Sequence, residues 1–305
     1  MHRRAYQRAS WGLVCAAVVT FGGAVVGPLP ARAAKADEKL REPGPSAKRR
    51  PATSKGDEAP TLAKGTKVAA KEGKRAKAEF EVKKPRRWGK CPGDMVTVAG
   101  FCIDRYEAYV AEILPGGKLK KHSPFEPVNG LKNIKALNKR GRMPQAYISR
   151  NEAEIACHNA GKRLCTDEEW LTACKGPKPT TWPYGKEHEP GRCNDRGVSA
   201  FNLYFGKGEA VPQSLYTYEN LNDPRLNRAE GTCAPSGKFK RCKNSYKVYD
   251  MVGNLHEWTA TPSGTFRGGY YLDVHKHGDG CDYRTTAHNG KYHDYSTGFR
   301  CCADR

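Results

Sequence analysis

The 305-residue sequence has no C-x-x-C pair, although it contains twelve cysteines. This absence argues against a zinc ribbon and against a thioredoxin-type redox centre, because both rely on that spacing. The sequence also lacks an internal repeat, an RNP motif and a helix-turn-helix pattern. We therefore expect no specific recognition of nucleic acid.

Large apolar residues are almost absent from residues 34–90 before Phe80, whereas this segment carries 18 Lys and Arg against 8 Asp and Glu. Such a composition cannot bury enough surface to offset the entropy of ordering, so we predict a disordered Lys/Ala/Pro-rich linker here. Its excess of ten positive charges is about half of the chain's net +21. A basic tail of this kind can contact anionic polymers through counterion release, and a solvated spacer is the simpler interpretation.

The amino terminus combines a basic start, a short apolar run and the A-x-A sequence that ends at Ala33. This pattern predicts a secretory signal peptide over residues 1–33, cleaved after Ala33. We therefore expect an exported protein, periplasmic or extracellular, with no transmembrane segment in the mature chain. The globular part is predicted to span residues 91–305.

Eleven of the twelve cysteines lie within residues 91–305. In an exported domain this density predicts a disulfide framework. Because eleven is odd, at least one thiol is left over or pairs between chains. Two local pairs are open possibilities, Cys91 with Cys102 and Cys233 with Cys242.

Two short helices are predicted from their terminal signals. Ser149 and Glu152 form an S-x-x-E capping box before a run that stops at Gly161, and Thr166 and Glu169 repeat the pattern before Gly176. Elsewhere, short β-rich runs alternate with loops rich in Gly, Pro and Asn. The sequence thus predicts a largely irregular, disulfide-rich α+β domain.

A series of motifs in residues 91–305 resembles the formylglycine-generating enzyme, or sulfatase-modifying factor, family. The motifs are "FCIDRYEAYV", "GKRLCTDEEW", "WPYG", "RCND", "DMVGNLHEW", "FRGGYY" and "GFRCCAD", in that order. The resemblance implies the family's C-type-lectin-like fold. It also implies a first-helix disulfide between Cys157 and Cys301. The family partner of Cys174 falls near Thr285 here, which leaves Cys281, Cys193 or another cysteine open to it.

A structural calcium site is predicted around Asp250 and Glu257, whose hard carboxylate oxygens flank a Gly253-containing turn. A capped turn with a structural glutamate is the alternative. The resemblance implies the following calcium ligands: Asp250, the carbonyls of Gly253 and Leu255, and Glu257, with a second site that begins at Asn194 and Asp195.

The resemblance also implies a copper ion held by two cysteines after "RGG", but this sequence supplies only Cys281. The earlier position falls at Leu272 or Asp273. A family serine is replaced by Tyr270 and a family tryptophan by His256. We therefore expect no formylglycine generation, because Cu(I) favours two thiolates.

The same stretch offers another set of possible metal ligands or catalytic residues: Asp273, His275, His277 and Cys281, with His256 nearby in the family groove. On a strand, an H-x-H pair places both imidazoles on one face. In an exposed basic loop the same histidines would have no catalytic role.

Two functions follow from these alternatives. The first is a calcium-stabilised module that binds an unknown protein, peptide, glycan or envelope polymer without chemistry. The second is a metal-dependent oxidase, with nonheme iron or copper, that acts on a peptide or small molecule in the family groove. Converging His and Asp side chains would favour the oxidase, and a groove filled by Tyr270 and Tyr271 would favour the binding module.

Overall fold

The computed structural model describes residues 87, 89–206 and 211–305. The predicted signal peptide, its cleavage site at Ala33 and nearly all of the predicted linker lie outside these residues. Within them, no helix is both long and apolar enough to cross a membrane.

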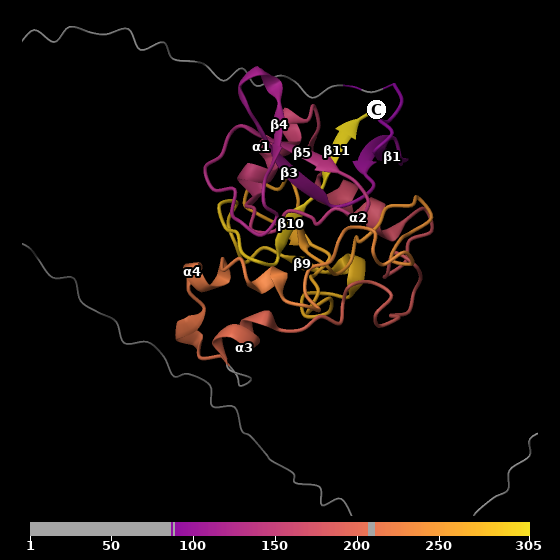
Figure 1. Cartoon of the computed structure of the whole chain (residues 1–305). Helices are drawn as coiled ribbons and strands as arrows, with labels where there is room; N and C mark the ends of the chain where they lie inside the picture. The colour runs from indigo at the N-terminus through magenta and orange to yellow at the C-terminus, as the bar shows by residue number, and fades with distance from the viewer. Residues whose placement is uncertain (1–86, 88, 207–210) are drawn as a thin grey trace, which may run out of the picture. The chain divides into compact units, whose positions relative to one another are not determined.

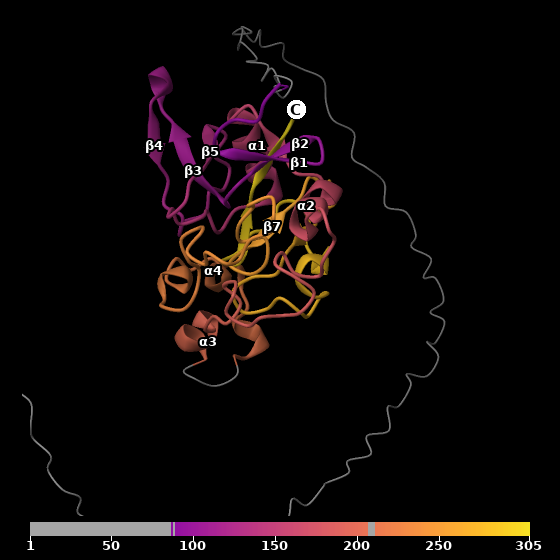
Figure 2. The ribbon, with the colours of Figure 1, turned by 90° about the vertical axis from the view of Figure 1, so that its right-hand side faces the viewer.

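The first of three sheets joins distant parts of the chain in the order β1-β2-β11-β6. Its antiparallel pairings place β11 between β2 and β6, so a late strand lies at the centre. Figures 1 and 2 show β11 running into this sheet beside the early strands. The strands are β1 (Met95–Val98), β2 (Phe101–Asp104), β6 (Arg163–Leu164) and β11 (Cys301–Asp304).

The second sheet, ordered β10-β7-β8-β9, carries the segments on which the sequence analysis focused. It contains β7 (His256–Trp258), β8 (Phe266–Arg267), β9 (Arg284–Thr285) and β10 (Thr297–Phe299), with β10 parallel to β7. The third sheet contains β3 (Ala108–Ile113), β4 (Leu119–Lys121) and β5 (Ile134–Asn138), in the order β4-β3-β5.

Both predicted helices form where their capping signals place them. Helix α1 (Arg150–Asn159) begins after Ser149, whose side chain accepts from the Glu152 backbone N–H. Helix α2 (Asp167–Lys175) has a complete Thr166–Glu169 capping box and ends at Gly176 with φ of 74°. The described residues also contain short helices that the sequence analysis did not predict: α3 (Ala200–Phe205), α4 (Tyr218–Leu221), η1 (Pro115–Gly117), η2 (Gln213–Leu215), η3 (Leu226–Arg228) and η4 (Gly280–Asp282).

Five disulfides link these elements. Helix α1 is joined to β11 by Cys157–Cys301, the pair that the resemblance implied, and the local Cys91–Cys102 link forms as well. The adjacent Cys302 also belongs to a disulfide, so both neighbours on β11 are tied to earlier segments. The other three pairs are Cys165–Cys302, Cys174–Cys281 and Cys193–Cys242.

The Cys233–Cys242 hairpin was a wrong prediction. Cys242 pairs with Cys193, and Cys233 stays a buried free thiol. The intervening residues turn at Gly237, whose φ is 74°, and do not form a paired hairpin.

Candidate functional site

The turn that precedes β7 is fixed by its contacts with Asn194. A Cβ on Gly253 would lie 2.2 Å from the Asn194 carbonyl oxygen, so only glycine fits there. The Asn254 backbone N–H donates to that carbonyl at 2.9 Å. The Asn194 side-chain amide donates to Asn254 Oδ1 at 2.8 Å. The turn is therefore held rigidly on the segment where the second calcium site was predicted.

The two carboxylates predicted for calcium are both buried, but their surroundings differ. Glu257 accepts from Arg300 through both oxygens, at 2.5 Å each, and from Trp170 Nε1 at 2.8 Å. Asp250 Oδ2 accepts from the Gly237 N–H at 2.6 Å. Burial raises the pKa of Asp250 to about 7, and the nearby Glu257 carboxylate adds to this effect.

A third buried carboxylate, Glu107, lies close to this pair. Its Oε2 accepts from the Asn254 side chain at 2.7 Å, and its Oε1 has no hydrogen-bond partner. Burial raises the pKa of Glu107 well above its usual value, and the charges of Asp250 and Glu257 raise it further. Arg300 is the cation that acts on all three groups, so three carboxyl groups share one guanidinium here.

At the second predicted calcium site, the side chains of Asn194 and Asp195 both have hydrogen-bond partners within the protein. Asp195 accepts from the Gly191 N–H through Oδ1 and contacts His188 Nε2 through Oδ2, both at 2.8 Å. The Asn194 amide nitrogen donates to the Thr232 carbonyl as well as to Asn254. The Asp195 side chain therefore orients the His188 imidazole.

The positions that correspond to the family's copper ligands cannot supply two thiolates. Cys281 is fully buried and bonded to Cys174. Asp273 Oδ1 accepts the backbone N–H groups of His275 and Lys276, at 3.0 Å each. These bonds help to hold the pKa of Asp273 below its ordinary value, even though burial acts in the opposite direction.

His256 lies in a buried chain of hydrogen bonds that ends at Asp273. Its Nδ1 lies 3.1 Å from Ser296 Oγ, and its Nε2 lies 3.2 Å from the Tyr283 hydroxyl, which donates to Asp273 Oδ2 at 3.1 Å. Burial lowers the pKa of His256 to about 3, so the ring is neutral at physiological pH. Tyr283 separates the imidazole from the carboxylate, so these two groups do not converge on one metal position.

The H-x-H pair lies in a loop, the second of the two placements that the sequence left open. His275 lies in a bend and His277 in a turn, and Gly278 has a φ of 110°. The two rings therefore separate: His277 contacts Tyr283, with ring centroids 5.5 Å apart, and His275 contacts Trp182 at 5.3 Å. In the described part of the chain, no three His, Cys, Asp or Glu side chains are grouped to hold a metal ion.

Tyrosine side chains pack together beside His256. Tyr271 is fully buried, and Tyr270 packs on His256 with ring centroids 4.8 Å apart. Tyr270 also contacts Tyr271 at 5.3 Å and Tyr295 at 6.1 Å. This is the tyrosine-filled arrangement that the sequence analysis associated with a binding module.

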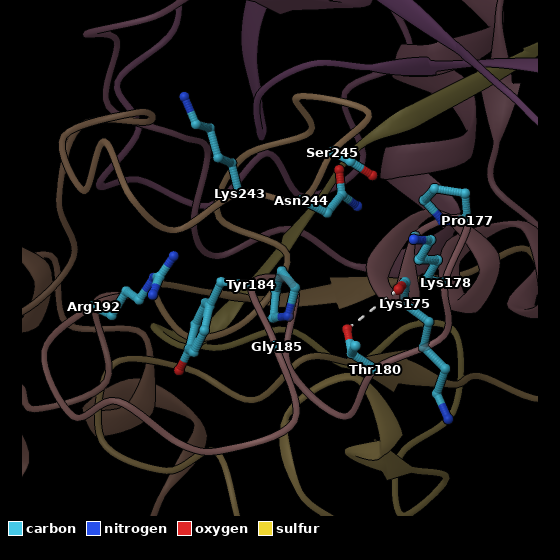
Figure 3. A pocket seen from close by; sticks show the side chains of 12 residues that line it. Lys175, Pro177, Lys178, Thr180, Tyr184, Gly185, Arg192, Lys243, Asn244 and Ser245 are labelled. Atoms are coloured by element: carbon cyan, nitrogen blue, oxygen red, sulfur yellow. Dashed lines mark hydrogen bonds between the residues drawn. The ribbon is translucent and has the colours of Figure 1, made fainter.

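A basic pocket of about 430 Å³ lies beyond the end of α2, and the sequence analysis did not identify it. Figure 3 shows Arg192 beside Tyr184, with Lys243 and Lys178 on either side of Asn244. No acidic residue lines the pocket. Its lining residues are Lys175, Gly176, Pro177, Lys178, Thr180, Pro183, Tyr184, Gly185, Arg192, Lys243, Asn244 and Ser245.

The pocket's four cations are not equally available to a ligand. Lys175 forms an ion pair with Asp282 at 2.7 Å, and Arg192 pairs with Glu189. The Arg192 guanidinium also lies 4.4 Å from the Tyr184 ring centroid. Lys178 has no ion pair among the described residues. The Lys243 ammonium donates to the Tyr249 hydroxyl at 3.3 Å and lies 5.3 Å from the centroid of the same ring. Neither lysine is paired with a carboxylate in the described part of the chain.

Comparison with known proteins decides the family. The model of the sulfatase-modifying factor enzyme 1-like domain matches residues 49–305. The chain belongs to this family. The mixed sheets, few helices and irregular backbone confirm the predicted α+β, C-type-lectin-like fold of the sulfatase-modifying-factor type.

Similar family members include both active and inactive proteins by name. The inactive C-alpha-formylglycine-generating enzyme 2 of Mus musculus is 28% identical over 172 residues, which are 53% of this chain and 49% of that protein. The formylglycine-generating enzyme of Mus musculus is 27% identical over 282 residues, 72% of this chain and 70% of that protein. The chain thus spans about half the length of the first of these relatives.

Among solved structures, PvdO from Pseudomonas aeruginosa superposes with a TM-score of 0.39 at 16% identity, covering 67% of this chain and 80% of that one. Pro183, Tyr184 and Gly185 of the "WPYG" motif line the basic pocket. Lys178 and Lys243 also line it, although they are about 65 residues apart in sequence. Sequence spacing gave no signal for their proximity.

Proposed function

We propose that the protein is an exported, calcium-stabilised binding module of the sulfatase-modifying factor family that does not generate formylglycine. The observation that carries this proposal is the Cys174–Cys281 disulfide. It removes the one thiolate that the sequence offers at the copper position, and Asp273 at the other position accepts backbone N–H groups. These residues do not fit Cu(I), which favours two thiolates.

The comparisons support this proposal without deciding it. One of the similar relatives is itself named an inactive formylglycine-generating enzyme. The tyrosines around Tyr270 leave the imidazole of His256 neutral and enclosed, and no described three-residue ligand group favours the oxidase alternative. A binding role requires none of these catalytic groups.

Calcium is proposed at the Asp250 turn because buried oxygen donors gather there. The carboxyl groups of Asp250, Glu107 and Glu257 surround one guanidinium, and Glu107 Oε1 has no hydrogen-bond partner. Hard oxygen donors of this kind suit Ca²⁺. Asp250 would supply a carboxylate ligand, and the Gly253 and Leu255 carbonyls would complete the turn's contribution. Glu257 would be the fourth ligand that the family resemblance implies. Arg300 and Trp170 hold its carboxylate in place.

The basic pocket is the proposed binding surface, and its chemistry suits an acidic saccharide of an envelope polymer. Lys178 and Lys243 would contact a carboxylate, while Pro177, Pro183 and Tyr184 offer apolar faces to a sugar ring. The volume of about 430 Å³ is in the range of small-ligand sites.

The catalytic half of the proposal is tested with a sulfatase-type cysteine peptide. We expect no conversion to formylglycine by mass spectrometry, with or without added copper, because two thiolates are not available. A formylglycine-generating enzyme is the positive control. Conversion that Cys281→Ser abolishes would refute the proposal and restore the enzyme.

The binding half is tested with trigalacturonic acid, using calorimetric titration of the full chain. Replacing Lys178 and Lys243 together by alanine is expected to weaken binding about three- to tenfold, the range of exposed ion pairs. The control variant replaces Lys118 and Lys132, two exposed lysines that precede β4 and β5, and it also leaves the basic tail intact. Equal weakening in both variants would show that the saccharide does not bind in the pocket.

A further inference from the structure

Two histidines that are 87 residues apart in sequence both contact the indole of Trp182. The rings of His188 and His275 lie at right angles in an edge arrangement, with centroids 4.7 Å apart and an interplanar angle of 75°. His188 stacks on the Trp182 indole at 4.3 Å, and His275 contacts the same indole at 5.3 Å. The packing against a buried tryptophan fixes both imidazoles.

Each imidazole uses one nitrogen to contact a carboxylate. His188 Nε2 lies 2.8 Å from Asp195 Oδ2, and the Asp195 side chain is completely buried. His275 Nδ1 lies 2.7 Å from Asp279 Oδ1. The second nitrogens, His188 Nδ1 and His275 Nε2, contact no hydrogen-bonding partner among the described residues.

This arrangement matches the usual environment of metal-binding histidines. Such a histidine directs one nitrogen to the metal and is held by a carboxylate through the other nitrogen. Two imidazoles that share an ion at a nitrogen–metal distance of about 2.0 Å, at angles between 90° and tetrahedral, have ring centres roughly 4.5–5 Å apart. The observed 4.7 Å between His188 and His275 falls within that spacing.

We propose that His188 and His275 form a two-imidazole site for a borderline divalent transition ion, with Cu²⁺ bound more tightly than Zn²⁺. Imidazole nitrogen suits both ions, and Cu²⁺ has the higher affinity for a given nitrogen site. The side chains of His188 and His275 are 24% and 50% exposed, so the ion has access from solvent, and water fills the other positions. Two protein ligands without a third give a reversible site of modest affinity.

The inference is independent of the proposed function and reassigns two sequence-derived expectations. Asp195, predicted for calcium, orients His188. His275, predicted to act with His277, acts with a histidine of another segment. This site and the Asp250 turn also prefer different ions. A hard ion prefers the oxygens of the turn, and a borderline ion prefers the nitrogens of His188 and His275.

The site is tested by titrating the full-length protein with Cu²⁺ while its tryptophan fluorescence is recorded. We expect saturable quenching, because bound Cu²⁺ would lie within a few ångströms of Trp182, and Zn²⁺ should reverse it by competition. His275→Ala should abolish the quenching. Because His275 is exposed, misfolding of the variant would not explain that loss. The matched control is His277→Ala, an exposed histidine two residues away, which should quench like the wild type.

Two more variants separate binding at this site from copper bound elsewhere, such as at the amino-terminal segment. Trp182→Phe should remove the quenching while calorimetry still detects Zn²⁺ binding. Asp279→Asn should weaken Zn²⁺ binding about tenfold, as loss of a supporting carboxylate usually does. Quenching that persists in Trp182→Phe, or equal losses in the His275 and His277 variants, would overturn the proposal.

Discussion

His256 shows how a single buried side chain determines the acid sensitivity of this fold. It stands where the family resemblance implies a tryptophan, and it is buried between Ser296, Tyr283 and Tyr270. Burial lowers its pKa to about 3 from an ordinary value of 6.5. The ring therefore stays neutral in the folded state at pH values where the unfolded chain takes up a proton.

We expect His256→Gln to reduce the acid sensitivity of the protein. In the wild type, the contribution of His256 to the free energy of unfolding is complete above pH 6.5 and declines as the pH falls towards 3, by roughly 1.4 kcal/mol per pH unit. Urea unfolding at pH 7 and pH 5 should therefore show about 2 kcal/mol less loss in the variant. The exposed His277→Gln variant is the control. An equal loss in all three proteins would contradict this explanation.

At the scale of elements, short-range signals in the sequence predicted the structure correctly. The capping boxes at Ser149 and Thr166 each act within four residues, and both helices begin after them. Helices α3 and α4 are only six and four residues long. Ser199 and Thr217 cap them, but each has an asparagine where a capping box has glutamate, so the signal was weaker. The sequence left the H-x-H segment open between a strand and an exposed loop, and the structure has a loop there, with positive φ at Gly278 and Gly280.

The turn before β7 is the element whose stability we expect to depend on calcium. Removing calcium with EGTA should lower the melting temperature by about 2–8 °C, because the carboxylates of Asp250 and Glu107 then lose their compensating charge. Readdition of Ca²⁺, but not Mg²⁺, should restore it, since Mg²⁺ requires a tighter octahedral site.

Asp250→Ala distinguishes the effect of losing the ion from the effect of losing the hydrogen bond that Asp250 accepts from Gly237. The variant should melt lower than the wild type, and EGTA should not lower its melting temperature further. A wild-type melting curve that EGTA leaves unchanged would show that the turn is held by Arg300 and Asn194 alone.

For the whole molecule, the family frame was predictable and most of the cross-links were not. Motifs in series identified the fold and implied Cys157–Cys301, whereas cysteine spacing alone does not determine connectivity. Cys174–Cys281 was one of several open pairings, and Cys193–Cys242 was missed because it joins two irregular loops. The same limit applies to His188 with His275 and to Lys178 with Lys243, which only the folded chain brings together.

The position of two disulfides on β11 has a consequence for the order of events during biosynthesis. Cys301 and Cys302 close loops of 144 and 137 residues, so each link must wait until nearly the whole domain has been made. A nascent chain that stops before residue 301 leaves Cys157 and Cys165 without their partners. These two thiols then remain open to incorrect oxidation or to capture by a disulfide isomerase. Formation of the Cys157–Cys301 and Cys165–Cys302 links therefore reports that β11 has been made.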